Sequence, residues 1–312
     1  MEVFGSTFDD SVFEGAREKP SAVSQSPYNA KLCEVEWFSE NIDTEDPLEK
    51  QKIFKFRADF AYRRKNFQEA LNAYTSCILY IPDGNLTIRR DILEGMARCW
   101  CHLGRREEAL SLTEILKNDA SNTCHLTCLL HLTTNIHEHF GDLRGQIEIL
   151  QQLCSLHPYH QWYWMKLAES CLHLLQTLSA PTVTPGPPQD EEADGHKGAR
   201  IQERLKGERD HVWLKACMCF VRSRLLLRTL KGQQSSFVLQ NSERAMRKAD
   251  EALQYLEPRE TTLQRITEVM LEDLVAERMK EDHLDGEGLA GLSLNDFQDR
   301  WWNRILQAEV LI

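Results

Sequence analysis

Three residues with metal-binding side chains lie on one face of a predicted helix. Cys124, Cys128 and His131 are four and three residues apart, which brings their side chains to the same side of an α-helix. Thiolate and imidazole groups bind Zn²⁺, and a fourth ligand or a water molecule would complete the tetrahedron. A buried helical stripe requires the same spacing, and Leu129 and Leu132 flank the three residues. Packing is the favoured interpretation, and a zinc site is the alternative.

Other motifs with catalytic chemistry occur in the wrong context. His137 and His139 are too close in sequence to share one helix face as metal ligands. The glycine-rich stretch 286–291 follows a predicted helix rather than a strand, so it indicates a loop and not a dinucleotide site. The sequence contains no P-loop, no Gly-x-Ser-x-Gly elbow and no Cys-x-x-Cys. We expect no enzyme activity and no cofactor, with a hydrolytic site assembled from scattered glutamates and histidines as an alternative.

The composition indicates an ordinary soluble protein. The chain has 312 residues, of which 42% are hydrophobic and 27% are charged. Met1 is not followed by the basic and apolar regions of a signal peptide, so we expect an intracellular protein, cytoplasmic or nuclear and not secreted. No stretch is long and apolar enough for a membrane span. The ten cysteines are scattered, which favours reduced and mostly buried thiols.

The net charge argues against nucleic acid as the main partner. A charge of −11 opposes general affinity for phosphates. A local basic surface is the alternative, on the predicted helix that carries Arg222, Arg224, Arg228 and Lys231. The leucines beside these residues favour a helix that is buried on one side and has solvated arginines on the other.

The elements that must position these residues are helices in a repeating order. Small and apolar residues recur between Lys52 and about Gln176 with nearly constant gaps. Ala70, Ala109 and Gln146 hold equivalent places, 39 and 37 residues apart, and Pro158 follows Pro82 by 76 residues. A period of this length predicts stacked antiparallel helix pairs.

This pattern resembles the tetratricopeptide repeat. The resemblance implies an all-α fold with three and a half repeats and C-terminal capping helices. The chain departs from the family pattern at Lys65, where a turn glycine is expected, at Gln146, where a small residue is expected, and at Ser121, where a proline is expected. The extra residues beyond the 34 of that family are expected in the loops between repeats.

Six short stretches resemble a second, narrower family. They are residues 10–14, 30–34, 61–64, 155–158, 166–169 and 224–227. They are similar to a vertebrate family of uncharacterised proteins whose human member is named chromosome 8 open reading frame 76. That resemblance implies a tetratricopeptide-like fold and no particular activity.

Composition divides the chain into four segments. Residues 1–50 hold 12 acidic and 4 basic residues with several aromatic side chains, which predicts a largely disordered acidic segment that contacts a partner or the protein's own helices. Residues 51–178 carry the repeats. Residues 179–200 are rich in proline and glycine and predict a linker. Residues 201–312 are predicted to be helical and to cap the array.

The tetratricopeptide resemblance also implies a concave groove that is lined by the first helix of each pair. The residues expected there are Lys55, Asp59, Tyr62, Arg98, His102, Asn135, His139, Trp162, Lys166 and His173. His102, His139 and His173 hold the same place in three successive pairs, so we expect them to form a row. The family's clamp for chaperone tails needs two asparagines and three basic residues, of which only Lys55 is present. We therefore expect a protein-binding adaptor or scaffold without the chaperone carboxylate clamp.

Overall fold

The computed structural model describes residues 37–39, 43–179, 195–230, 236–272, 274 and 294–309. The chain divides into two compact units, Met1–Asn41 and Ile42–Ile312. In the first unit the described part is a 3-10 helix, Trp37–Ser39, in which the rings of Trp37 and Phe38 meet edge to face with centroids 5.9 Å apart. Most of the predicted disordered segment 1–50 and most of the predicted linker lie outside the described residues, although α1 already begins at Pro47. In the described parts all regular elements are helices, which confirms the all-α fold.

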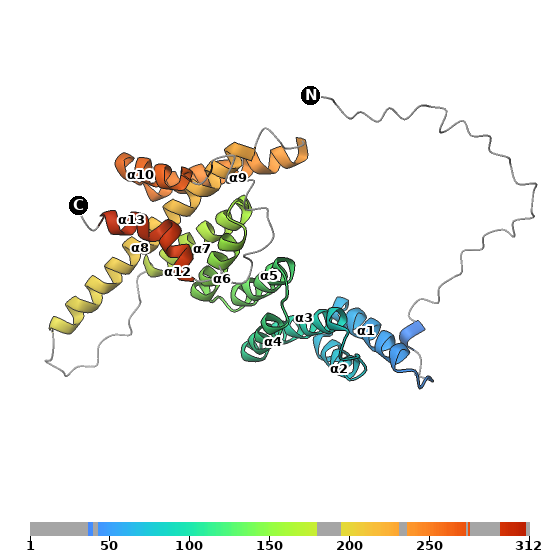
Figure 1. Cartoon of the computed structure of the whole chain (residues 1–312). Helices are drawn as coiled ribbons and strands as arrows, with labels where there is room; N and C mark the ends of the chain where they lie inside the picture. Colours follow the sequence, from blue (N-terminus) through green and yellow to red (C-terminus); the bar gives the residue numbers. More distant parts are fainter. Residues whose placement is uncertain are drawn as a thin grey trace, which may run out of the picture. The chain divides into compact units, whose positions relative to one another are not determined.

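Seven helices follow one another between residues 43 and 179, a stretch described without a gap (Figure 1). They are α1 (Pro47–Arg63), α2 (Phe67–Ile78), α3 (Leu86–His102), α4 (Arg106–Asn118), α5 (Thr123–His139), α6 (Leu143–Leu156) and α7 (Gln161–Ser179). Each helix packs on the next one in sequence, and α3 also contacts α1 and α5. Neighbour-to-neighbour packing is what an array of helical pairs requires, while the relation to the tetratricopeptide repeat stays a prediction.

The turns inside successive helix pairs share one backbone conformation. Lys65, Gly104 and Gly141 have positive φ angles of 63°, 76° and 68°. These residues are separated by the same steps of 39 and 37 residues that the side-chain pattern gives. The left-handed conformation ends the first helix of each pair and turns the chain towards the second.

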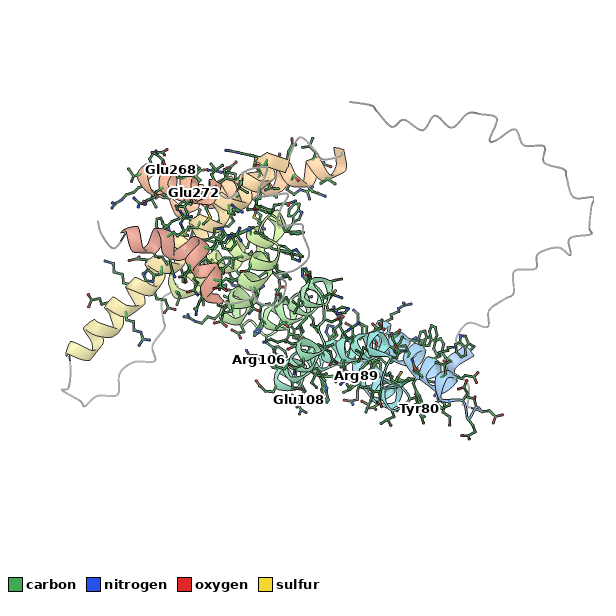
Figure 2. The ribbon with its side chains drawn as sticks, in the orientation of Figure 1. Tyr80, Arg89, Arg106, Glu108, Glu268 and Glu272 are labelled. Atoms are coloured by element: carbon green, nitrogen blue, oxygen red, sulfur yellow. The ribbon has the colours of Figure 1, made fainter. Side chains whose placement is uncertain are left out.

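The residue after each of these turns starts the next helix. Asn66 and Asp142 accept a hydrogen bond from a backbone N–H of α2 and α6 through their side chains, whereas Arg105 gives α4 no side-chain cap. The pKa of the Asp142 carboxyl is lowered, first by the N–H of Gly145 and then by His137 and the neighbouring guanidinium of Arg106. Arg106 lies at the start of α4 (Figure 2). Its ion pair with Asp142 therefore joins two helix pairs.

We expect Gly104→Ala to lower the free energy of unfolding by about 1 kcal/mol, because an L-residue is disfavoured at positive φ. An added methyl group has no atom within 4 Å at Gly104, so the loss is conformational and not steric. Gly84 is the matched control, since it also has open space but no positive φ. Urea unfolding followed by circular dichroism measures both variants. Equal losses for Gly84→Ala and Gly104→Ala would contradict the explanation.

The C-terminal helices pack on the end of the array (Figure 1). They are α8 (Gly195–Leu230), α9 (Ser236–Leu256), α10 (Glu260–Leu271), α12 (Leu294–Phe297), the π-helical turn η4 (Gln298–Trp302) and α13 (Asn303–Glu309). α8 contacts α7, α9 and α10, and α12 contacts α6. α8 begins at Gly195, inside the segment 179–200 that the composition predicts as a linker.

An aromatic cluster closes the core at this end. Trp164 of α7 meets Trp301 with ring centroids 5.0 Å apart, and Phe297 lies 4.8 Å from Trp301 and 4.9 Å from Trp302. All four side chains are buried. Arg304, one turn after Trp301, forms an ion pair of 2.7 Å with Glu272. Glu272, labelled in Figure 2, follows the last residue of α10. The C-terminal helices therefore pack on α6 and α7, while their role as a cap stays a prediction.

The prediction of solvated arginines on α8 was wrong for Arg222. This side chain is fully buried, and its guanidinium donates hydrogen bonds to the carbonyl oxygens of Met270 at 2.6 Å and Pro158 at 3.2 Å. Arg224 is paired with Asp250 at 3.1 Å. Arg228 is exposed, and Lys231 lies outside the described residues. Two of the four residues of the nucleic-acid alternative, Arg222 and Arg224, therefore bind other groups of the protein.

Nine cysteines are described, and none of them is in a disulfide. Seven are buried, as the sequence predicts for packing thiols, while Cys124 and Cys128 are exposed. Burial raises the pKa of Cys99 to about 12, which makes its thiolate rare at neutral pH. A search of the described helices for one that is long and apolar enough to span a bilayer finds none.

Candidate functional site

The predicted groove residues lie on α1, α3, α5 and α7, and contacts join these four helices in sequence. Lys55 of α1 forms an ion pair with Asp91 of α3 at 2.8 Å. The hydroxyl oxygen of Tyr62 of α1 lies 3.3 Å from the Nε2 atom of His102 of α3. The α5 and α7 contacts are described below. Contacts therefore join the helices that carry these residues, while their role as one binding groove stays a prediction.

At the α1 end the predicted residues bind one another. Lys55 is paired with Asp59 at 2.7 Å, and Asp59 also accepts a hydrogen bond of 2.6 Å from the hydroxyl of Tyr74. Burial alone would lower the pKa of Lys55, but its hydrogen bonds and charge interactions with Asp59 and Asp91 raise it overall. The single clamp residue that matches the chaperone-binding pattern is thus already neutralised by two carboxylates.

Glycine at position 95 is part of the same arrangement. A Cβ atom there would lie 2.6 Å from the ring of Tyr74. Glycine therefore lets the Tyr74 ring pack directly on the backbone of α3 and reach Asp59. Any larger side chain at this position would have to displace the Tyr74 ring.

The centre of the row is aromatic and contains two of the three predicted histidines. The rings of His102 and His139 are 5.8 Å apart, and Phe67 stacks on His102 at 4.2 Å. Burial and then the nearby charges of His139 and Arg98 lower the pKa of His102. Arg98 is itself paired with Glu94 at 2.6 Å. Asn135, on α5, is exposed.

The third histidine does not join this row. His173 lies on α7, where it is exposed and lines a hollow with Glu138, Lys166 and Glu169. Lys166 forms an ion pair of 2.7 Å with Glu138 of α5. The expected row of three is therefore a contacting pair, His102 and His139, followed by a separate position.

His131, one of the three residues of the zinc alternative, takes part in a different cluster. The Nε2 atom of His131 lies 2.8 Å from the hydroxyl of Tyr163, and the Tyr163 ring stacks on His160 at 3.8 Å. Burial lowers the pKa of His157, and the charge of His131 lowers it further. The Nε2 atom of His157 lies 2.7 Å from the hydroxyl oxygen of Thr127. Within the described ranges, no three His, Cys, Asp or Glu side chains are placed to hold a metal ion.

A hollow of about 570 Å³ lies where α7 faces α9. Trp162, Met165 and Lys166 of α7 line one side, and Asn241, Arg244, Ala245 and Lys248 of α9 line the other. Trp162 is 37% exposed. Lys248 is paired with Glu169 at 2.6 Å, so the two helices are connected across the hollow.

The sequence did not predict the contribution of α9. Its amphipathic pattern predicts a helix with one buried face, but the position of that helix beside α7 depends on packing between distant segments. The only available signal is the group of basic residues Arg244, Arg247 and Lys248 on the polar face.

These features define an all-helical protein of consecutively packed helices, with an exposed mixed-charge surface along α1, α3, α5 and α7 and a hollow beside α9. The family model described as "Family of unknown function (DUF5588)" matches residues 2–191 and 189–308 of the chain. The human "Uncharacterized protein C8orf76" is 34% identical over an alignment of 356 residues, gaps included. This alignment covers 97% of this chain and 93% of the human protein. The rat homologue is 34% identical over 352 residues with the same coverage. The chain therefore belongs to the C8orf76 family.

Proposed function

We propose that this chain is a non-enzymatic adaptor that binds another protein through the surface formed by α1, α3, α5 and α7. The observation that carries the proposal is the set of contacts that join these four helices, from the half-buried Tyr62 through the exposed His102 and His139 to the Lys166–Glu138 ion pair. An extended surface of this kind suits a protein segment rather than a small substrate.

The chemistry of the row supports binding rather than catalysis. Its charged groups are arranged as pairs, Lys55 with Asp59 and Asp91, and Arg98 with Glu94. Paired charges beside partly exposed aromatic rings are typical of interfaces, where aromatic anchors supply most of the affinity and the charges select the partner.

The adaptor proposal predicts a partner that depends on this surface. We expect affinity capture with the full-length protein to yield a stoichiometric partner, which is lost when Tyr62, Arg98 and Trp162 are all replaced by alanine. The matched control replaces Gln68, Glu114 and Glu148, three exposed residues of α2, α4 and α6, by alanine. Circular dichroism verifies that both variants are folded. A partner that persists unchanged in the first variant contradicts the proposal.

A further inference from the structure

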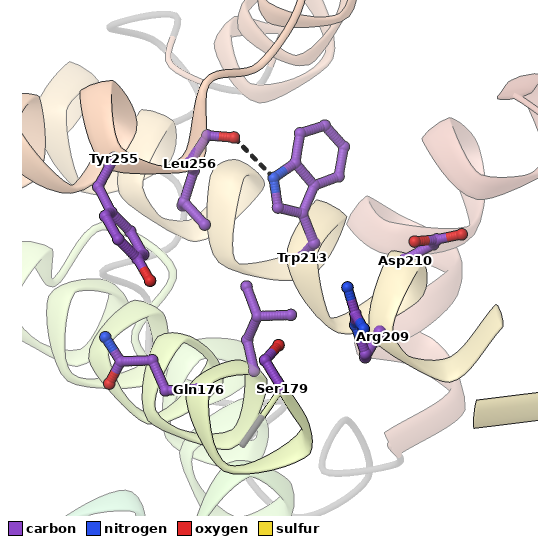
Figure 3. Close-up of a pocket in the computed structure, with 8 residues that line it drawn as sticks. Gln176, Ser179, Arg209, Asp210, Trp213, Tyr255 and Leu256 are labelled. Atoms are coloured by element: carbon purple, nitrogen blue, oxygen red, sulfur yellow. Dashed lines mark hydrogen bonds between the residues drawn. The ribbon is translucent and has the colours of Figure 1, made fainter. Parts of the chain in front are cut away.

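Three hollows with shared lining residues form one furrow beside α7. The hollow of about 570 Å³ at Trp162 shares Glu169 and Lys248 with one of about 390 Å³. That second hollow shares Gln176 and Tyr255 with a third of about 310 Å³, which is shown in Figure 3. We call this surface, from Trp162 to Ser179 on the α7 side and from Asn241 to Leu256 on the α9 side, the α7–α9 furrow.

The furrow has the length of a short peptide. At a rise of about 1.5 Å per helical residue, α7 covers roughly 25 Å between Trp162 and Ser179. An extended chain covers the same distance with about eight residues at 3.3 Å each. A small metabolite would fill only one of the three hollows, whereas a peptide strand can occupy all of them.

Each end of the furrow presents an aromatic side chain to solvent. Trp162 is 37% exposed beside Met165, and Tyr255 is 66% exposed beside Leu175. At the Tyr255 end, Trp213 is held by a hydrogen bond of 2.8 Å from its indole nitrogen to the Leu256 carbonyl (Figure 3). Exposed aromatic rings with apolar neighbours are preferred contact points for apolar side chains of a partner.

The two ends differ in charge. In the hollow at Trp162, Lys166 and Lys248 are neutralised by Glu138 and Glu169. Arg244, which is exposed, has no ion pair with any residue that the structure describes. The charged side chains of this hollow are three cations and two anions, so it is positive by one charge in a chain of net charge −11.

Towards the Tyr255 end of the furrow, the excess of positive charge disappears. Glu251 lines the second hollow, and Arg209 and Asp210 line the third with opposite charges. Arg244 is thus the group that would receive a carboxylate, at the Trp162 end. A guanidinium can bind both oxygens of a carboxylate at once, which favours an acidic side chain over a neutral one.

We propose that the α7–α9 furrow binds an extended acidic segment of a partner protein. One bulky apolar side chain packs on Trp162 and Met165, an adjacent Asp or Glu pairs with Arg244, and a second apolar side chain, about six residues away, packs on Tyr255. This inference rests on the proposed adaptor function and names the chemistry of its partner.

A random-peptide library selected on the full-length protein tests the proposal. We expect enriched peptides that contain two apolar or aromatic positions with an acidic residue next to one of them. Arg244→Glu should weaken the selected peptides by about tenfold or more in fluorescence anisotropy, because it replaces attraction by repulsion. Arg247→Glu is the matched control, since Arg247 is exposed on the same helix and does not line the furrow.

The outcomes separate the two proposals. Basic or featureless peptides, or an equal loss of affinity in Arg244→Glu and Arg247→Glu, would overturn the acidic-segment inference. If affinity capture still finds a partner that is lost with Tyr62→Ala and Arg98→Ala, two changes outside the furrow, the adaptor function stands and only the assignment of its ligand fails. Acidic peptides that lose affinity with Arg244→Glu and keep it with Arg247→Glu support the acidic-segment inference and, with it, the adaptor function.

Discussion

Replacement of Arg222 by alanine is expected to lower the free energy of unfolding by about 4 kcal/mol. The side chain is fully buried, and its two terminal nitrogens donate to the carbonyl oxygens of Met270 and Pro158. Alanine would leave a cavity and remove the donor from both carbonyl groups. Urea unfolding followed by circular dichroism measures the loss.

The size of this effect follows from what Arg222 connects. Met270 lies at the last turn of α10, where the carbonyl groups carry the negative end of the helix dipole, which favours a cation. Pro158 lies between α6 and α7, and its carbonyl also accepts a hydrogen bond of 2.8 Å from Trp164. The guanidinium carbon lies 5.6 Å from the centroid of the Trp164 ring. One side chain of α8 thus connects α10 with the segment between α6 and α7.

Two further variants separate the contributions. Arg222→Met keeps most of the volume but not the donors, so we expect a loss between those of the alanine variant and the native protein. Arg228→Ala, on the exposed side of the same helix, should change stability by about 0.5 kcal/mol or less. If Arg222→Met is as stable as the native protein, the hydrogen bonds to Met270 and Pro158 contribute nothing.

The sequence could not predict this position, for a physical reason. Periodicity shows which residues of an isolated helix share a face, and it predicted the helices of the array and the all-α class. Residues 216–223 of α8 are all buried, because α7, α9 and α10 surround this part of the helix. A helix that is covered on several sides has no solvated stripe, so an arginine in its pattern does not indicate a surface.

The same limit applies to the candidate site. The repeat register brought together residues from α1, α3, α5 and α7, because the helices of a stacked array keep their order from one pair to the next. It predicted the contact between His102 and His139. It also placed His173 in the same row, whereas His173 lines a hollow that α7 forms with α9. Arg244 and Tyr255 were missed, since their contact with α7 depends on the path of the chain after residue 179.

The second large effect is expected at the C-terminal end, where Trp301→Ala should lower the free energy of unfolding by about 3–5 kcal/mol. Trp301 is 1% exposed and packs between Trp164 of the array and Phe297 of the cap. Trp162→Ala is the matched control, because it removes the same side chain from a site that is 37% exposed and should cost about 1 kcal/mol or less. Urea unfolding of both variants gives the comparison.

The location of the loss matters as much as its size. In an array whose helices pack mainly on their neighbours, removing a cap contact weakens the adjacent helices first. Amide hydrogen exchange in Trp301→Ala should therefore accelerate in α6, α7 and α8 and remain nearly unchanged in α1 and α2. If exchange accelerates equally from α1 to α8, the chain unfolds as one cooperative unit, and the C-terminal helices are part of a single core instead of a cap on an array.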